Sequence, residues 1–156
     1  MTLEKAMLAA QGYAELGMTD DALRELDSVP DEFRLGEGVL QMRLFVLMRA
    51  RRWAEAVDVC NALRAANPDG TTGFIHGAFC LHELGRTNEA RELLLAGPAT
   101  LKNEPTYHYN LGCYAAVLGY THEALHYLKA SFVLDKKFRD IARIDPDLRS
   151  VRDLIS

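Results

Sequence analysis

Two histidines and a glutamate form a pattern that could hold a zinc ion. His122, Glu123 and His126 match HExxH, which on a helix places two imidazoles on one face around zinc and offers the glutamate as a general base. The pattern raises a zinc-dependent hydrolase as one hypothesis. The extended pattern also needs a glycine and a third histidine downstream, but Lys129 and Phe132 occupy those positions.

The same glutamate belongs to an octet that recurs along the chain, which gives it a structural explanation. The octet that holds Glu123 recurs in recognisable form around residues 16–23, 51–57 and 84–90, and its alanines lie at a constant interval of 34 positions: Ala22, Ala56, Ala90 and Ala124. A fixed period of this length is typical of stacked helical repeats. The histidines then merely flank a structural position. We therefore expect no catalytic residue, no bound metal and no cofactor.

Each repeat is predicted to be a helix, a tight turn and a second helix. Counting back from the alanines gives four units, about 3–36, 37–70, 71–104 and 105–138, within a single domain over 1–156. Gly17, Gly85 and Gly119 follow the last apolar residue of a first helix, where glycine adopts the left-handed conformation without strain. In the second unit Arg51 and Arg52 replace that turn, and Trp53 is expected to pack between the two helices.

The ends of the repeats predict two further features. Pro30 and the Gly97-Pro98 pair stop the second helices of the first and third units early. The segment 139–156 is expected to cap the last repeat, with Asp145 as the N-cap of a helix from Pro146 to Leu154. A solenoid needs such a cap to cover its last apolar face.

Composition and charge restrict the class of partner. The 156 residues are 49% hydrophobic and 26% charged, with a net charge of −4, which argues against a nucleic-acid partner. Residues 1–38 hold nine acidic and three basic side chains, a net charge of −6, so the acidity lies in the first repeat. The chain has three cysteines without a CxxC pair and no signal-peptide or membrane-spanning stretch. We expect a cytoplasmic protein that does not bind membranes.

The repeat resembles the tetratricopeptide (TPR) family over residues 3–138. The best copy is the fourth, which carries the family's pattern at Tyr107, Asn110, Leu111, Gly112, Ala115, Leu118, Gly119, Glu123, Ala124, Leu125, Leu128 and Ala130. The resemblance implies an all-α, TPR-type α-solenoid of four helix-turn-helix repeats with a C-terminal capping helix. It also implies binding of another protein in a concave groove lined by the first helix of each repeat.

Carried onto this chain, the groove residues are mostly aromatic, sulfur-containing or uncharged. They are Gln41, Phe45, Met48 and Arg49 in the second unit, Ile75, His76, Phe79 and His82 in the third, and Tyr109, Asn110 and Cys113 in the fourth. Such a lining suits an apolar peptide or helix. A clamp for a C-terminal carboxylate, which some members of the family build from Lys, Asn and Arg, is not expected, because Asn110 alone could belong to one.

We therefore predict a non-enzymatic interaction module or scaffold that holds a peptide or helix of a partner protein. A small secretion-type chaperone that shields an apolar client segment is the alternative within binding functions, and the zinc hydrolase is the alternative from another class. The sequence leaves open the partner, the pathway and self-association. It also leaves open whether the C-terminal helix caps the last repeat or fills the groove.

Overall fold

The computed structural model describes residues 2–155, and these residues form helices and no strand. The long helices pair into four hairpins: α1 (Leu3–Glu15) with α2 (Thr19–Asp27), α4 (Glu37–Arg49) with α5 (Trp53–Ala66), α6 (Thr72–Glu83) with α7 (Thr87–Leu95), and α8 (Pro105–Val117) with α9 (Thr121–Leu134). Short elements connect or follow them: α3 (Asp31–Arg34), η1 (Ala99–Asn103), α10 (Lys137–Ala142), η2 (Pro146–Leu148) and η3 (Arg152–Leu154).

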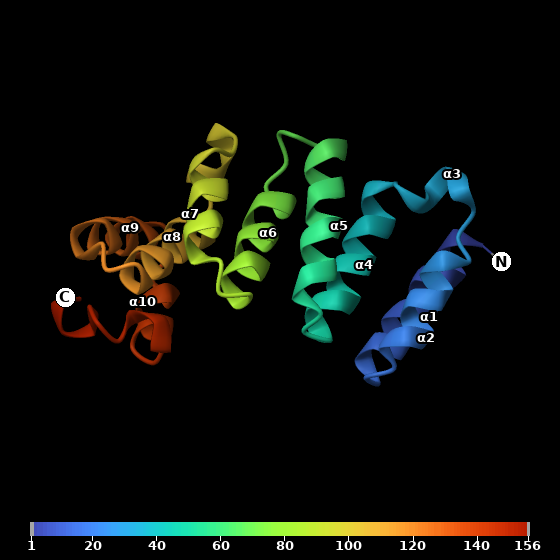
Figure 1. The fold of residues 1–156 in the computed structure, drawn as a ribbon, viewed down its shortest axis with the longest axis horizontal. Helices are drawn as coiled ribbons and strands as arrows, with labels where there is room; N and C mark the ends of the chain where they lie inside the picture. The colour runs from blue at the N-terminus through green and yellow to red at the C-terminus, as the bar shows by residue number, and fades with distance from the viewer. Residues whose placement is uncertain (1, 156) are drawn as a thin grey trace.

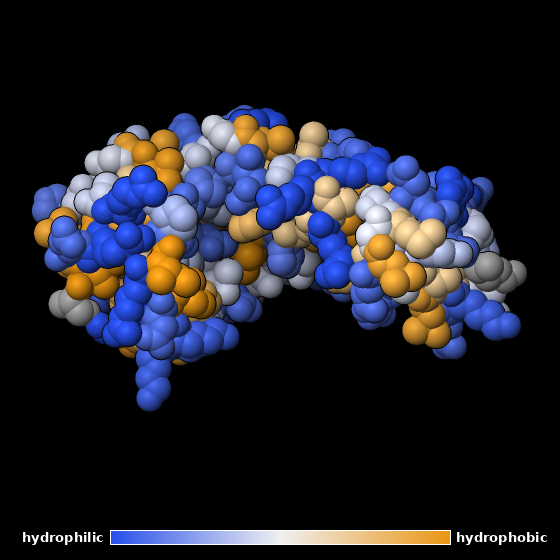
Figure 2. Space-filling view, turned by 90° about the horizontal axis from the view of Figure 1, so that it is seen from below, coloured by the Kyte–Doolittle hydropathy of each residue, from blue (hydrophilic) through white to orange (hydrophobic). Residues whose placement is uncertain are grey.

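The hairpins follow one another in a row from the N-terminus to the C-terminus (Figure 1). Seen from below that view, the row bends into an arch with a hollowed underside (Figure 2). The prediction of an all-α, TPR-type solenoid is confirmed. None of the helices within residues 2–155 combines the length and the apolar character that a bilayer crossing requires.

A tight turn joins the two helices in all four hairpins. Glycine forms this turn in three of them, as predicted, and another residue type forms it in the second hairpin. Gly17, Gly85 and Gly119 have φ angles of 76°, 79° and 85°. In the second hairpin Arg51 takes the same left-handed conformation with φ 58°. Trp53 contacts the following hairpin, because its ring meets Phe79 edge-on with 5.7 Å between centroids.

The four alanines of the repeat are all buried. Ala22, Ala56, Ala90 and Ala124 each have no exposed surface. At the last of these contacts, a Cβ added to Gly112 would lie 2.8 Å from the Leu128 side chain. Small residues therefore stand where the helices of a hairpin approach most closely, and they share a common phase along the chain.

Two of the second helices are short, as predicted. The helices α2 and α7 have 9 residues each, whereas α5 and α9 have 14. Pro30 lies in the break after α2, and Pro98 precedes the 3-10 turn η1. The proline ring disfavours helical geometry at the preceding residue, so both helices end early.

The C-terminal segment differs from the single helix expected over residues 146–154. It forms the two 3-10 turns η2 and η3, whose backbone bonds all span three residues. The Asp145 carboxylate caps the first turn by accepting from the Asp147 N–H at 3.0 Å, and the Asp145 carbonyl also accepts from the Arg152 guanidinium. Leu148 and Val151 are 0% and 1% exposed. The segment therefore buries Leu148 and Val151, whereas Leu154 at its end is 58% exposed.

Candidate functional site

A hollow lies between the first helices of the second and third hairpins. It has a volume of about 660 Å³, and its lining comes from α4, α5 and α6: Gln41, Leu44, Phe45, Met48, Arg49, Trp53, Thr72, His76 and Phe79. Six of these residues belong to the predicted groove, namely Gln41, Phe45, Met48, Arg49, His76 and Phe79. The repeat register thus brings side chains from two hairpins to one place.

The walls of the hollow are mainly apolar and aromatic. Phe45 is 40% exposed although it is a large hydrophobic residue, and Leu44 beneath it is 3% exposed. Trp53 and Phe79 form an edge-to-face pair within the lining. Burial lowers the pKa of His76, which keeps this imidazole neutral at pH 7. The hollow therefore offers aromatic contact area and few polar groups.

Arg49 is the charged residue of this lining. Its Nε donates to the carbonyl of Ala14 at 3.0 Å, and its Nη2 donates to the carbonyl of Glu15 at 3.4 Å. These carbonyls belong to the last turn of α1, where the helix dipole is negative. Within residues 2–155 no carboxylate lies in ion-pair distance of Arg49, so no acid neutralises its charge. The two carbonyl groups of the neighbouring hairpin hold the guanidinium in its orientation.

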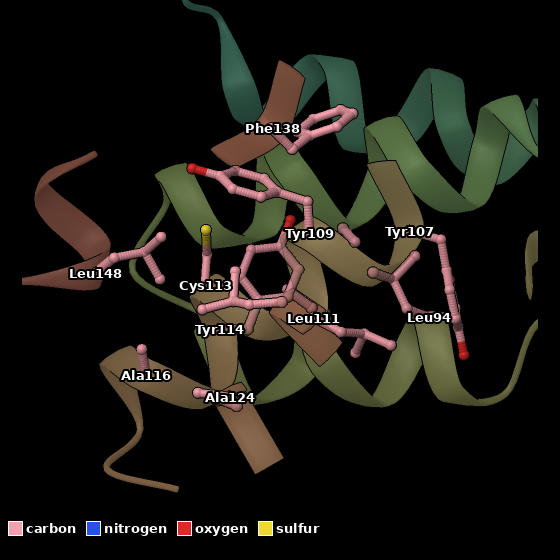
Figure 3. Close-up of a cluster of buried hydrophobic side chains, with 14 of the residues drawn as sticks. Leu94, Tyr107, Tyr109, Leu111, Cys113, Tyr114, Ala116, Ala124, Phe138 and Leu148 are labelled. Atoms are coloured by element: carbon pink, nitrogen blue, oxygen red, sulfur yellow. The ribbon is translucent and has the colours of Figure 1, made fainter. Parts of the chain in front are cut away.

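The predicted groove residues of α8 and the end of α6 lie elsewhere, under the C-terminal segment. Tyr109 and Cys113 are 5% and 4% exposed. The Tyr109 hydroxyl donates to Asp145 Oδ2 at 2.7 Å, and the Cys113 thiol lies 3.7 Å from the same oxygen. Leu148 points from the C-terminal segment toward Cys113 (Figure 3). This corrects the expectation that Tyr109 and Cys113 line an open groove, since the chain's own tail covers them.

His82 is also engaged by the tail. Its Nε2 lies 2.8 Å from Asp147 Oδ2, and its Nδ1 lies 2.9 Å from the Thr87 hydroxyl. The hydrogen bond to Asp147 raises the pKa of His82 against the opposing effect of burial. Ile75 packs against the core of the last two hairpins, and Asn110 is half-buried on α8. None of these three residues lines the hollow, so the prediction of one continuous groove is corrected.

Three lining residues were not predicted. Leu44 is a buried residue of α4, Thr72 is the first residue of α6, and Trp53 begins a second helix, which the family resemblance places away from the groove. The lost glycine turn was the available signal for Trp53. Arg51 forms that turn with a left-handed backbone, and the Trp53 indole contacts Phe79 of the next hairpin.

One group of potential metal ligands occurs among the described residues, and its atoms already have partners. Sγ of Cys113 and carboxylate oxygens of Asp145 and Asp147 lie within 4.8 Å of one another. The carboxylates hold Tyr109 and His82, respectively. Burial and the neighbouring Asp145 charge raise the pKa of the Cys113 thiol, which keeps it protonated. These contacts anchor the tail and do not produce a nucleophile.

The HExxH residues do not converge on a site. His122 and His126 are exposed on α9. The Glu123 carboxylate accepts from Nε and Nη2 of Arg91 on α7, at 2.7 and 2.6 Å. These hydrogen bonds lower the pKa of Glu123, whereas a general base near neutral pH requires a raised one. Glu123 therefore links the third hairpin to the fourth.

Comparison with known proteins gives structural relatives only. No family model and no curated protein matches the sequence. Among solved structures, MamA of MSR-1 is similar with a TM-score of 0.72 and 20% identity, over 88% of this chain and 79% of that one. A double mutant of MamA of RS-1 gives 0.73 and 17%, over 86% and 76%, and MamA of AMB-1 gives 0.67 and 21%, over 90% and 77%. At this identity the likeness shows the shared helical-repeat fold and supports the TPR resemblance at the level of fold.

Proposed function

We propose that this protein is a non-enzymatic interaction module that binds a segment of another polypeptide in the hollow between α4 and α6. The observation that carries the proposal is the lining of that hollow. Phe45 stands 40% exposed beside the Trp53–Phe79 pair, in a cavity of about 660 Å³. Concave apolar sites with a few convergent polar groups are the usual form of a binding site.

The residue types favour a polypeptide as the ligand. Aromatic side chains contribute most of the energy at protein interfaces, and Met48 offers an adaptable thioether beside them. Helices with apolar faces commonly dock into such grooves through side chains spaced by three or four positions. The hollow is bordered by two parallel first helices of successive hairpins, α4 and α6, which suits an elongated segment better than a compact metabolite.

The hydrolase alternative receives no support from the geometry of its motif. Glu123 is held by Arg91, and both histidines lie on the exposed side of α9. The three cysteines are free and buried, which supports a reducing compartment such as the cytoplasm for this binding function. A chaperone for an apolar client would use the same hollow.

Affinity capture with matched variants tests the proposal. Phe45→Ala removes an aromatic ring from the hollow, and Phe33→Ala removes an equally exposed ring (42% against 40%) from α3, outside it. We expect wild type and Phe33→Ala to retain a specific polypeptide that Phe45→Ala loses, with equal helicity in all three. Retention of the same polypeptides by the folded Phe45→Ala variant would reject the hollow as the binding site. Whether the captured polypeptide is folded or unfolded separates scaffold from chaperone.

A further inference from the structure

A positive charge at the border of the hollow indicates which charge a bound partner segment should have. Arg49 is the one lining residue with a formal charge at neutral pH, since the others described are apolar, polar or, for His76, neutral. A guanidinium has five N–H donors. Nε and Nη2 donate to Ala14 and Glu15 carbonyls, while Nη1 has no partner among residues 2–155.

Within residues 2–155, two arginines close to Arg49 in the sequence are paired with acids, whereas Arg49 is not. Arg64 of α5 likewise has no acid partner among these residues and donates to the Gly73 carbonyl and the Asn61 side chain. Arg43, on the same helix, lies 2.7 Å from an Asp27 oxygen. Arg52 lies 3.0 Å from Asp20 and also contacts Glu55. Arg49 is instead fixed in place by carbonyl groups and left with a positive charge beside apolar walls. That arrangement is complementary to a carboxylate on a bound molecule.

The chain's own tail shows which kind of segment suits the neighbouring hairpins. Asp145 and Asp147 reach Tyr109 and His82, and the adjacent Leu148 is fully buried. Acidic side chains supply the directional contacts there, and an aliphatic side chain supplies the buried area. The hollow likewise combines aromatic side chains with a cationic one, Arg49, which lies one position after Met48, the residue equivalent to His82 in the repeat.

We propose that the hollow recognises a partner segment in which an aspartate or glutamate side chain contacts Arg49 while apolar side chains contact Phe45 and Phe79. This inference rests on the proposed function and specifies its ligand. The acid is assigned to a side chain and not to a chain terminus. One guanidinium with two donors already engaged can satisfy a single carboxylate, and the docked tail uses side-chain carboxylates for the same purpose.

The test uses the purified full chain and a displayed library of random short peptides without free C-termini. Selected peptides are synthesised with amidated ends, and each is paired with a counterpart in which Asp or Glu becomes Asn or Gln. Trp53 is the single tryptophan of the chain and lines the hollow, so its fluorescence reports occupancy directly. Arg49→Met is compared with Arg43→Gln, which removes a paired arginine of the same helix outside the hollow.

We expect the selected peptides to be enriched in Asp or Glu and to change Trp53 emission. Affinity should fall about tenfold in Arg49→Met and about tenfold on peptide neutralisation, without a further loss when both are combined. Arg43→Gln should bind as wild type does. Equal affinity of wild type and folded Arg49→Met for the acidic peptides would overturn the inference, as would binding that requires a free C-terminus.

The same data separate this inference from the proposed function. Peptides that bind through Phe45 without any acidic preference would leave the interaction module standing and remove the role of Arg49. Failure to select any peptide whose binding is lost in Phe45→Ala would reject both. A change of Trp53 emission on concentrating the protein alone, abolished by Phe45→Ala, would assign the hollow to a second copy of this chain and overturn the acidic-segment proposal.

Discussion

His82 of α6 and Asp147 of the C-terminal segment are 65 positions apart in the chain, and their Nε2 and Oδ2 atoms lie 2.8 Å apart. The contact ties the tail to the third hairpin, while Tyr109 and Asp145 tie it to the fourth at 2.7 Å. The tail therefore closes the part of the predicted groove that these two hairpins would form. The open hollow is left to the second and third hairpins.

The His82 contact predicts a dependence of stability on pH. Its pKa is raised above the ordinary 6.5 by the hydrogen bond to Asp147, with smaller contributions from the charges of Asp147, Glu83 and Asp145. A raised pKa in the folded state means that the stabilisation is complete below the unfolded value and is lost as pH rises through the folded value. His82→Gln should therefore lower stability by about 1 kcal/mol near pH 6 and by less near pH 8.5. Thermal melts at both values test this; an equal loss at both would contradict it.

The burial of Leu148, a residue of the tail, leads us to predict that the Cys113 thiol is protected from thiol reagents. Cys60, Cys80 and Cys113 are 0%, 0% and 4% exposed, so all three should react slowly with a thiol reagent in the native protein. Leu148→Ala removes a fully buried anchor, a change that typically costs about 2–5 kcal/mol. The tail should then detach locally, and Cys113 should become reactive while the other two stay protected.

The control for this experiment is Leu154→Ala, because Leu154 lies on the same segment but is 58% exposed. Its thiol reactivity should equal that of wild type. Mass mapping of the labelled cysteine identifies the site. Equal labelling of all three thiols in Leu148→Ala would indicate global unfolding and not release of the tail.

Two glycines of equivalent helices predict opposite effects of the same substitution. A Cβ on Gly112 would lie 2.8 Å from Leu128 side-chain atoms and 3.3 Å from the Ala124 carbonyl oxygen, so Gly112→Ala should cost about 1–3 kcal/mol. A Cβ on Gly12 of α1 would meet nothing within 4 Å, so Gly12→Ala should stabilise by about 0.5–1 kcal/mol through helix propensity. Denaturant unfolding of both variants measures the difference, and a common sign would contradict the packing of α8 against α9.

The repeat could be read from the sequence because it is a local pattern. Ala22, Ala56, Ala90 and Ala124 mark a helix contact that each hairpin must make by itself, and glycine marks three of its four turns. The repeat register also gave correct lining residues, such as Phe45 and Phe79, at positions whose exposure depends only on the neighbouring hairpins.

The remainder of the site depends on contacts between distant parts of the chain. Tyr109 and Cys113 occupy groove positions by register, but the placement of Asp145 over them, 36 and 32 positions later, has no periodic signal. The Asp145 cap forms as predicted, but it is compatible with both an α-helix and a 3-10 turn, so it did not distinguish the two. Trp53 was not expected in the lining because it begins a second helix, and the resemblance places only first helices along the groove.

Glu123 gives the last prediction, which separates a structural role from a catalytic one. Its bidentate contact with Arg91 joins successive hairpins, with side chains 28% and 22% exposed. Glu123→Gln should lower stability by about 1 kcal/mol, and the loss should largely disappear in an Arg91→Met background. The purified protein should hold less than one equivalent of zinc, unchanged in His126→Ala, because both imidazoles are exposed and Glu123 is committed to Arg91. One tightly bound zinc per chain, lost together with a hydrolytic activity in His126→Ala, would restore the enzyme hypothesis.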